Sequence, residues 1–197
     1  SSHIEIQNQG SGSFTNCIFE DGVLILGSDL GAVDSCNFRD EASLVLRFRL
    51  PVTNCLFENP NAPIKCLPDF ASMLASCTFL GTDARIQLYG GNASVNDEWV
   101  VMGGVRYYEL TGNIRVRDGA VVSIGEGVVV QTNSVNRNLQ VGTTTSPGSV
   151  VANGVTFQRI GQPSSSHIEI QNQGSGSFTN CKFEDGVLVF SGVSSGS

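Results

Sequence analysis

The amino-acid sequence predicts an all-β solenoid, a fold in which short strands wind into stacked coils, here of about 20 residues each. Two repeats and the composition lead to this prediction. Residues 1–24 return at 165–188 with a single change, Ile18 to Lys182, and a shorter pattern recurs around the cysteines. The chain also contains 23 glycines and no capped run of helical periodicity, which favours short strands separated by tight turns.

The long repeat has a period of 164 residues, the distance from His3 to His167. The chain therefore comprises one full unit, residues 1–164, and the start of the next, residues 165–197. We expect the two to form one continuous domain, because each coil of a solenoid packs on its neighbours.

The short repeat is a six-residue pattern: apolar, any residue, Asn/Ser/Gly, Cys/Val, any residue, Phe. Cys and Phe are two positions apart and therefore face the same side of a strand. The position between them varies freely, and the single difference between the long copies falls there, so Cys and Phe are predicted to face inward. This predicted core ladder comprises Cys17, Cys36, Cys55, Cys77, Cys181, Phe19, Phe38, Phe57, Phe79, Phe157 and Phe183.

The residue before each cysteine is predicted to bend the chain, because Asn, Ser and Gly tolerate left-handed backbone angles. Stacked coils would place these residues in a corner ladder of Asn16, Ser35, Asn54, Ser76 and Asn180. Phe79 and Phe157 are 78 positions apart, close to four coils, which indicates eight coils in the long unit and nine to ten in the chain.

The strand pattern is clear in some stretches of the chain and absent in others. Residues 3–7 alternate as a strand does, with Ile4 and Ile6 predicted to face inward. Residues 90–98 are rich in Gly and Asn, and we expect them to protrude as a loop. Residues 131–149 show no clear alternation, so their coils are not assigned.

A valine-rich stretch from Trp99 to Val130, WVVMGGVRYYELTGNIRVRDGAVVSIGEGVVV, is followed by a GVTF segment ending at Phe157. It is similar to a module of large bacterial secreted and cell-surface proteins. The Asn/Ser corner followed by an inward residue resembles the pectate-lyase-like superfold. The resemblance implies a right-handed parallel β-helix and an extracellular or cell-surface location.

The six cysteines leave two possibilities open. An exported protein with an even number of cysteines often contains disulfides, and strand spacing does not forbid a bridge. However, Val155 occupies the same position of the pattern as Cys17 and Cys36, which favours a packed ladder of buried thiols. No Cys/His spacing typical of a zinc site is present.

Two further columns follow the phenylalanines. One residue later, Arg39 would lie between Glu20 and Glu58 as a small ion-pair ladder. Two residues later, Asp21, Asp40 and Asn59 would form a column of oxygen ligands for Ca²⁺. The alternative is that these are turn residues selected for backbone geometry.

The charge distribution limits the partners. The net charge of −7 argues against a nucleic-acid backbone as partner, and no apolar run is long enough to predict membrane insertion. Four cations are predicted to share one face and to bind acidic surface glycans, unless they form an ordinary solvated face: Arg47, Arg49, Lys65 and Arg85.

The sequence therefore favours a structural or adhesive role, in which the unit stacks end to end with neighbouring repeats or copies of itself in a long surface protein or filament. The alternative is a glycan-binding or polysaccharide-cleaving, lyase-like β-helix. No catalytic set could be assigned. Near-identity of the long copies also argues against catalysis, since recopying a whole unit adds length and valency.

Overall fold

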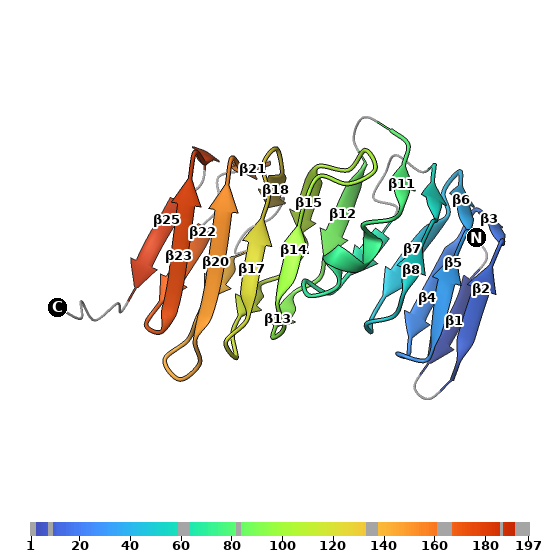
Figure 1. Cartoon of the computed structure of the whole chain (residues 1–197), viewed down its shortest axis with the longest axis horizontal. Helices are drawn as coiled ribbons and strands as arrows, with labels where there is room; N and C mark the ends of the chain where they lie inside the picture. Colours follow the sequence, from blue (N-terminus) through green and yellow to red (C-terminus); the bar gives the residue numbers. More distant parts are fainter. Residues whose placement is uncertain are drawn as a thin grey trace.

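The computed structural model describes residues 3–7, 10–58, 64–81, 84–132, 138–160, 167–185 and 187–191, without the side chains of His167 and Val187. It is a parallel β-solenoid of about eight turns and about 22 residues per turn, and 57% of it is strand. The coils stack along one long axis, with β1 (His3–Gln7) and β25 (Val187–Ser191) near opposite ends (Figure 1). The predicted fold class is confirmed.

One sheet, here called sheet A, runs the whole length of the solenoid. It contains nine strands in the order of the chain: β1, β4 (Val23–Gly27), β7 (Ser43–Leu46), β10 (Ile64–Cys66), β12 (Arg85–Leu88), β15 (Tyr107–Leu110), β18 (Val129–Thr132), β21 (Thr156–Arg159) and β24 (Lys182–Glu184).

Two pairs of shorter sheets complete the coils. In the first coils, sheet B contains β2 (Gly12–Thr15), β5 (Gly31–Asp34) and β8 (Val52–Thr53), and sheet C contains β3 (Ile18–Glu20), β6 (Asn37–Arg39), β9 (Leu56–Phe57) and β11 (Thr78–Phe79). In later coils, sheet D contains β13 (Gly91–Ala93), β16 (Ile114–Val116), β19 (Leu139–Val141), β22 (His167–Gln171) and β25, and sheet E contains β14 (Asp97–Trp99), β17 (Val121–Ile124), β20 (Gly148–Asn153) and β23 (Gly174–Thr179).

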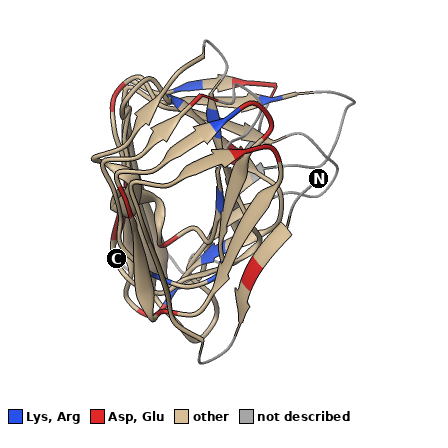
Figure 2. Cartoon of the chain, turned by 90° about the vertical axis from the view of Figure 1, so that its right-hand side faces the viewer, with Lys and Arg blue, Asp and Glu red and all other residues tan. Residues whose placement is uncertain are grey.

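The core is a set of vertical columns of side chains inside this closed perimeter, which Figure 2 shows along the rod. In sheet A, register partners in successive coils place one apolar side chain above another, and all of the following are buried: Leu24, Leu44, Ile64, Ile86, Tyr108, Val130 and Phe157. Each coil therefore depends on the next for the burial of its apolar side chains.

The two copies of the long repeat occupy different sheets. The sequence HIEIQ is β1 of sheet A in the first copy but β22 of sheet D in the second. Counting the single 3₁₀ helix η1 (Ala71–Leu74), β22 is the twenty-third element, so 22 steps at three per coil separate the copies. The 164-residue unit thus spans seven coils and one strand, so the prediction of eight coils in the unit was wrong, and the chain has about eight turns instead of the nine to ten predicted.

The later coils are longer, which accounts for this difference. Register partners in sheet A are 20 residues apart in the first coil, as in His3 and Val23. The distance is 27 residues between Val129 and Thr156, and 26 between Thr156 and Lys182. The period measured around the cysteines therefore underestimates the average coil.

The solenoid changes character between its fourth and fifth coils. Sheets B and C end, sheets D and E begin, and η1 stands where a second strand would otherwise lie (Figure 1). The carboxylate of Asp97 accepts the backbone N–H groups of Ala71 at 3.0 Å and Ser72 at 3.2 Å, at the start of η1. Residues 90–98, predicted to protrude, instead contribute β13 and the start of β14.

Candidate functional site

The predicted phenylalanine ladder exists as two separate stacks. Phe19, Phe38, Phe57 and Phe79 stack in sheet C, with ring centroids 4.8, 4.7 and 5.0 Å apart and interplanar angles of 11–12°. Phe157 and Phe183 stack at 5.1 Å, but in sheet A. The one-strand offset of the long repeat moves the same hexapeptide from one sheet to another.

The predicted cysteine ladder follows the same division, and all six thiols are free. Cys36, Cys55 and Cys77 are buried in the first coils, whereas Cys17 and Cys181 are half-buried. Each of these five thiols donates to a main-chain carbonyl, in most cases two residues before it, as Cys36 does to Asp34 at 3.3 Å. Burial raises the pKa of Cys36 to about 11.

Alkylation of the folded protein is expected to reach Cys17 and Cys181 well before the buried thiols. Burial limits access to Cys36, and its raised pKa keeps the thiolate fraction small. Mass spectrometry of peptides after timed iodoacetamide treatment measures the rates, and unfolded protein serves as the control in which all six thiols react. Labelling of Cys36 as fast as Cys17, or a thiol that stays unreactive after unfolding, contradicts this arrangement.

Four of the five predicted corner residues adopt left-handed backbone angles, with φ of 53° at Asn16 and Ser35 and 54° at Asn54 and Asn180. Ser76 does not, because it follows η1 instead of a strand. Its hydroxyl accepts the N–H of Asn54 at 3.2 Å, so it still links two coils at this corner.

The acidic column has the backbone of a turn. Asp21 and Asp40 have φ of 49° and 51°, while Asn59 lies outside the described residues. The structure therefore does not test the predicted column of Ca²⁺ ligands, and Ca²⁺ binding stays a prediction. The neighbouring ion-pair prediction is confirmed, since Arg39 lies 3.9 Å from Glu20 and 3.5 Å from Glu58.

The predicted glycan-facing cations are not one uniform patch. Arg47 pairs with Glu5 at 2.9 Å, and Arg85 lies 3.8 Å from Glu109. Lys65 faces outward from sheet A, since its neighbours Ile64 and Cys66 are buried. Arg49 is exposed and lies near the carboxyl group of Asp69. Figure 2 shows basic residues on more than one side of the perimeter.

A hollow of about 400 Å³ lies where the chain leaves sheet A in the third to fifth coils. Its lining comprises Arg47, Leu67, Tyr89 and Gly90. Arg47, whose guanidinium also pairs with Glu5, and the Tyr89 ring make this hollow one candidate site for a polar ligand with a negative charge.

The outer face of sheet A carries a row of polar side chains that the sequence interpretation missed. Glu109 is 3% exposed and Gln131 is 6% exposed, although they alternate with core residues and so point outward. The amide of Gln87 donates to Glu109 at 2.9 Å, and that of Gln131 donates to Gln158 at 3.0 Å. These bonds join successive coils and give the row a stabilising role.

Two buried acids at the sheet transition were also missed. Asp97 is 3% exposed and caps η1, and Asp69 is 9% exposed with one carboxylate oxygen that has no hydrogen-bond partner. Burial raises the pKa of both carboxyl groups. The only sequence signal for them is their position beside an interrupted strand pattern, and the paired N–H groups on Asp97 indicate a structural role.

The Asp69→Asn variant is expected to become more stable relative to the wild type as pH rises from about 4 towards neutral. A raised folded-state pKa means that the folded protein binds the proton more tightly than the unfolded chain. That contribution is present below the unfolded pKa and is lost as pH rises through the folded pKa. Urea titrations across this range measure the difference.

Asp34→Asn is the matched control for this pH dependence. The hydrogen bond from Thr53 lowers the pKa of Asp34, so its contribution has the opposite sign and is lost as pH falls. Parallel pH profiles for the two variants would contradict the assignment of Asp69 as a buried acid.

The two copies of the repeated coil differ in the strands that cover them. Strands β1, β2 and β3 have a neighbouring strand on one side only. Ile4 is 45% exposed, whereas Ile168, its counterpart in the second copy, is 7% exposed with strands on both sides. The same sequence is thus a buried coil in one place and an open coil in the other.

The comparisons with protein-family models, with curated proteins and with solved structures found no match to this chain. Within the described residues, no helix has the length and apolarity needed to cross a membrane. The same residues contain no group of three or more His, Cys, Asp or Glu side chains that could hold a metal ion. Fold and repeats together define the chain as a parallel β-solenoid.

Proposed function

We propose that this chain is a structural module of a long extracellular surface protein or filament, in which each 164-residue unit continues into the next as one rigid rod. The observation that carries the proposal is that residues 165–188 repeat residues 1–24 with one change and lie in parallel register on the preceding coil, where Ile168 is buried. A unit whose opening sequence recurs in register on its own last coils suits growth by addition of units.

A lengthened chain, residues 1–164 followed by residues 1–197, tests this function. Because residues 165–188 repeat residues 1–24 with one change, the junction is native in sequence. The added unit spans seven coils and one strand, and strands lie about 4.8 Å apart, so the rod is expected to lengthen by about 35 Å. Small-angle X-ray scattering and electron microscopy measure this length.

The matched control separates the same two units by a flexible Gly/Ser linker, which is expected to give two bodies with variable spacing. If the native junction scatters like the linker version, the units do not form a continuous rod and the proposed function is wrong.

A second candidate function, binding of an acidic glycan, is favoured by the hollow at Arg47 and Tyr89. Calorimetric titration with acidic oligosaccharides, together with ultraviolet absorbance for unsaturated products, distinguishes binding from lyase cleavage. Arg47→Ala and Tyr89→Ala are expected to abolish any binding, while Phe48→Ala, at an exposed position outside the hollow lining, is expected to leave it unchanged. Titration without measurable heat in the wild type rejects this candidate.

A further inference from the structure

The second copy of the repeat shows which surface the repeated coil recognises. Strands β22, β23 and β24 lie on β19, β20 and β21 in parallel register. Ile168 pairs with Leu139 and Phe183 pairs with Phe157. The receiving surface is therefore the side of the coil from Leu139 to Arg159 that faces the second copy.

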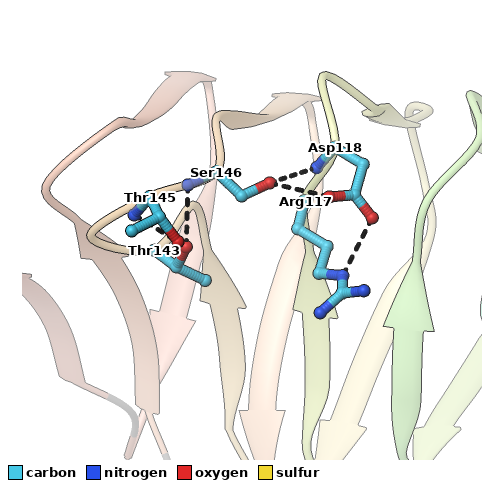
Figure 3. A network of polar contacts seen from close by, with 5 residues as sticks. All are labelled: Arg117, Asp118, Thr143, Thr145 and Ser146. Atoms are coloured by element: carbon cyan, nitrogen blue, oxygen red, sulfur yellow. Dashed lines mark hydrogen bonds and ion pairs between the residues drawn. The ribbon is translucent and has the colours of Figure 1, made fainter.

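A turn between β19 and β20 is held in place by the coil beneath it (Figure 3). The hydroxyl of Thr143 accepts the N–H groups of Thr145 at 3.2 Å and Ser146 at 2.9 Å. The Ser146 hydroxyl donates to the carboxylate of Asp118 at 2.9 Å, and that carboxylate also accepts a bond from Arg117. These bonds brace the turn against the preceding coil.

The same turn makes polar contacts with the second copy. Gln173 donates its N–H to the carbonyl of Thr143 at 3.3 Å and its amide to the carbonyl of Thr144 at 3.1 Å. The braced turn thus presents carbonyl acceptors to the incoming coil.

Close backbone contact makes this surface selective. A Cβ atom at Gly174 would lie 2.0 Å from the carbonyl oxygen of Val141, so only glycine fits at that point of the incoming coil. The first copy has glycine at the equivalent position, Gly10. Residues 1–24 therefore meet the strictest steric requirement of the surface.

The one difference between the copies has little effect on this fit. Ile18, which replaces Lys182, is 58% exposed and points outward. Lys182 forms an exposed ion pair with Glu184, and such pairs contribute about 0–1 kcal/mol. The two copies are therefore expected to bind the same surface with nearly equal affinity.

We propose that the coil from Leu139 to Arg159 is a docking surface for residues 1–24 of a second copy of this chain, and that residues 165–188 of the same chain occupy it as an intramolecular plug. The proposal rests on the proposed structural function. The plug has the advantage of tethering, whereas joining two chains requires β22, β23 and β24 to leave β19, β20 and β21. The plugged monomer is accordingly the ground state, and weakening the plug leads to joining.

The joint has a defined geometry. Since the two copies are seven coils and one strand apart, a joined chain is rotated by one strand position, about a third of a turn, and advanced by about 35 Å. Three chains would restore the starting face after about 105 Å. A surface feature of the unit, such as the hollow at Tyr89, would face three directions in turn.

The full chain carrying Ile168→Asp tests the proposal, because the buried plug residue then disfavours the intramolecular coil. Light scattering after size exclusion is expected to show at least a doubling of mass that increases with protein concentration, while the wild type stays monomeric. The double variant Ile4→Asp/Ile168→Asp carries the same change in the donor and is expected to remain monomeric.

Hydrogen exchange measured by mass spectrometry shows which copy occupies the surface. Peptides from the two copies can be told apart because they differ in mass and flanking sequence. In the Ile168→Asp oligomers, residues 3–24 are expected to gain protection and residues 167–185 to lose it. Gly174→Val, with Gly10→Val as the donor control, is a second pair that acts through steric displacement.

The proposal is overturned if both plug variants expose residues 167–185 and still remain monomeric, or if the double variants assemble as the single ones do. Either result leaves the lengthened-chain test unaffected, since that test does not depend on joining between molecules. Failure of the docking surface and failure of the rod are therefore distinguishable.

Discussion

Replacing Phe38 with alanine is expected to destabilise the folded chain by about 3–5 kcal/mol. Phe38 is fully buried, and its ring lies between those of Phe19 and Phe57, with centroids 4.8 and 4.7 Å away. Truncation removes the apolar burial and both stacking contacts. The hydrogen-bonded strands keep the neighbouring rings at the strand spacing, so the cavity cannot collapse fully.

Urea unfolding followed by far-ultraviolet circular dichroism measures this loss. Phe48→Ala is the matched control, because Phe48 is 49% exposed, and it is expected to change stability by no more than about 0.5 kcal/mol. Fluorescence of the single tryptophan, Trp99, reports the fifth coil separately, since solenoids can unfold in segments. Equal losses for the two variants would show that the phenylalanine stack does not hold the first coils together.

The alternation of side chains was enough to predict the solenoid, because it records whether a residue faces in or out. The hexapeptide ending at Phe38 and the one ending at Phe183 share the same inward pair, and both are inward in the structure. Alternation does not record which sheet a strand joins. That is set by the number of residues in the intervening turns, and the sheet change between copies could not be derived from the pattern.

Other features were hidden because they depend on long-range contacts. β19 has only three residues, Leu139–Val141, too few for alternation to be visible. Asp97 is fixed by N–H groups of η1, 25 and 26 residues earlier in the chain. Of the predicted site residues, the structure joins Arg47 to the hollow but leaves Lys65 and Arg85 outside its lining, since they lie on the strands rather than at the turn.

Replacing Gly103 with alanine is expected to cost about 2–4 kcal/mol. Gly103 follows Trp99 in a tight turn closed by the bridge between Met102 and Val105, and it lies against the last strand of sheet C. A Cβ atom there would lie 2.1 Å from the carbonyl oxygen of Cys77, a backbone atom that cannot move without disturbing β11. Urea unfolding measures the cost.

Gly119→Ala separates the two possible origins of this cost. Gly103 and Gly119 both have a positive φ, 47° and 81°. A Cβ atom at Gly119 meets nothing within 4 Å, so only backbone strain of about 1–2 kcal/mol applies there. A larger loss for Gly103→Ala therefore measures the contact between the turn and β11. Because that turn covers the end of sheet C where sheet E begins, its displacement is expected to weaken the packing between the first four coils and the rest, which sheet A still connects. Equal losses would mean that the turn does not join the two halves of the rod, and that sheet A alone holds them together.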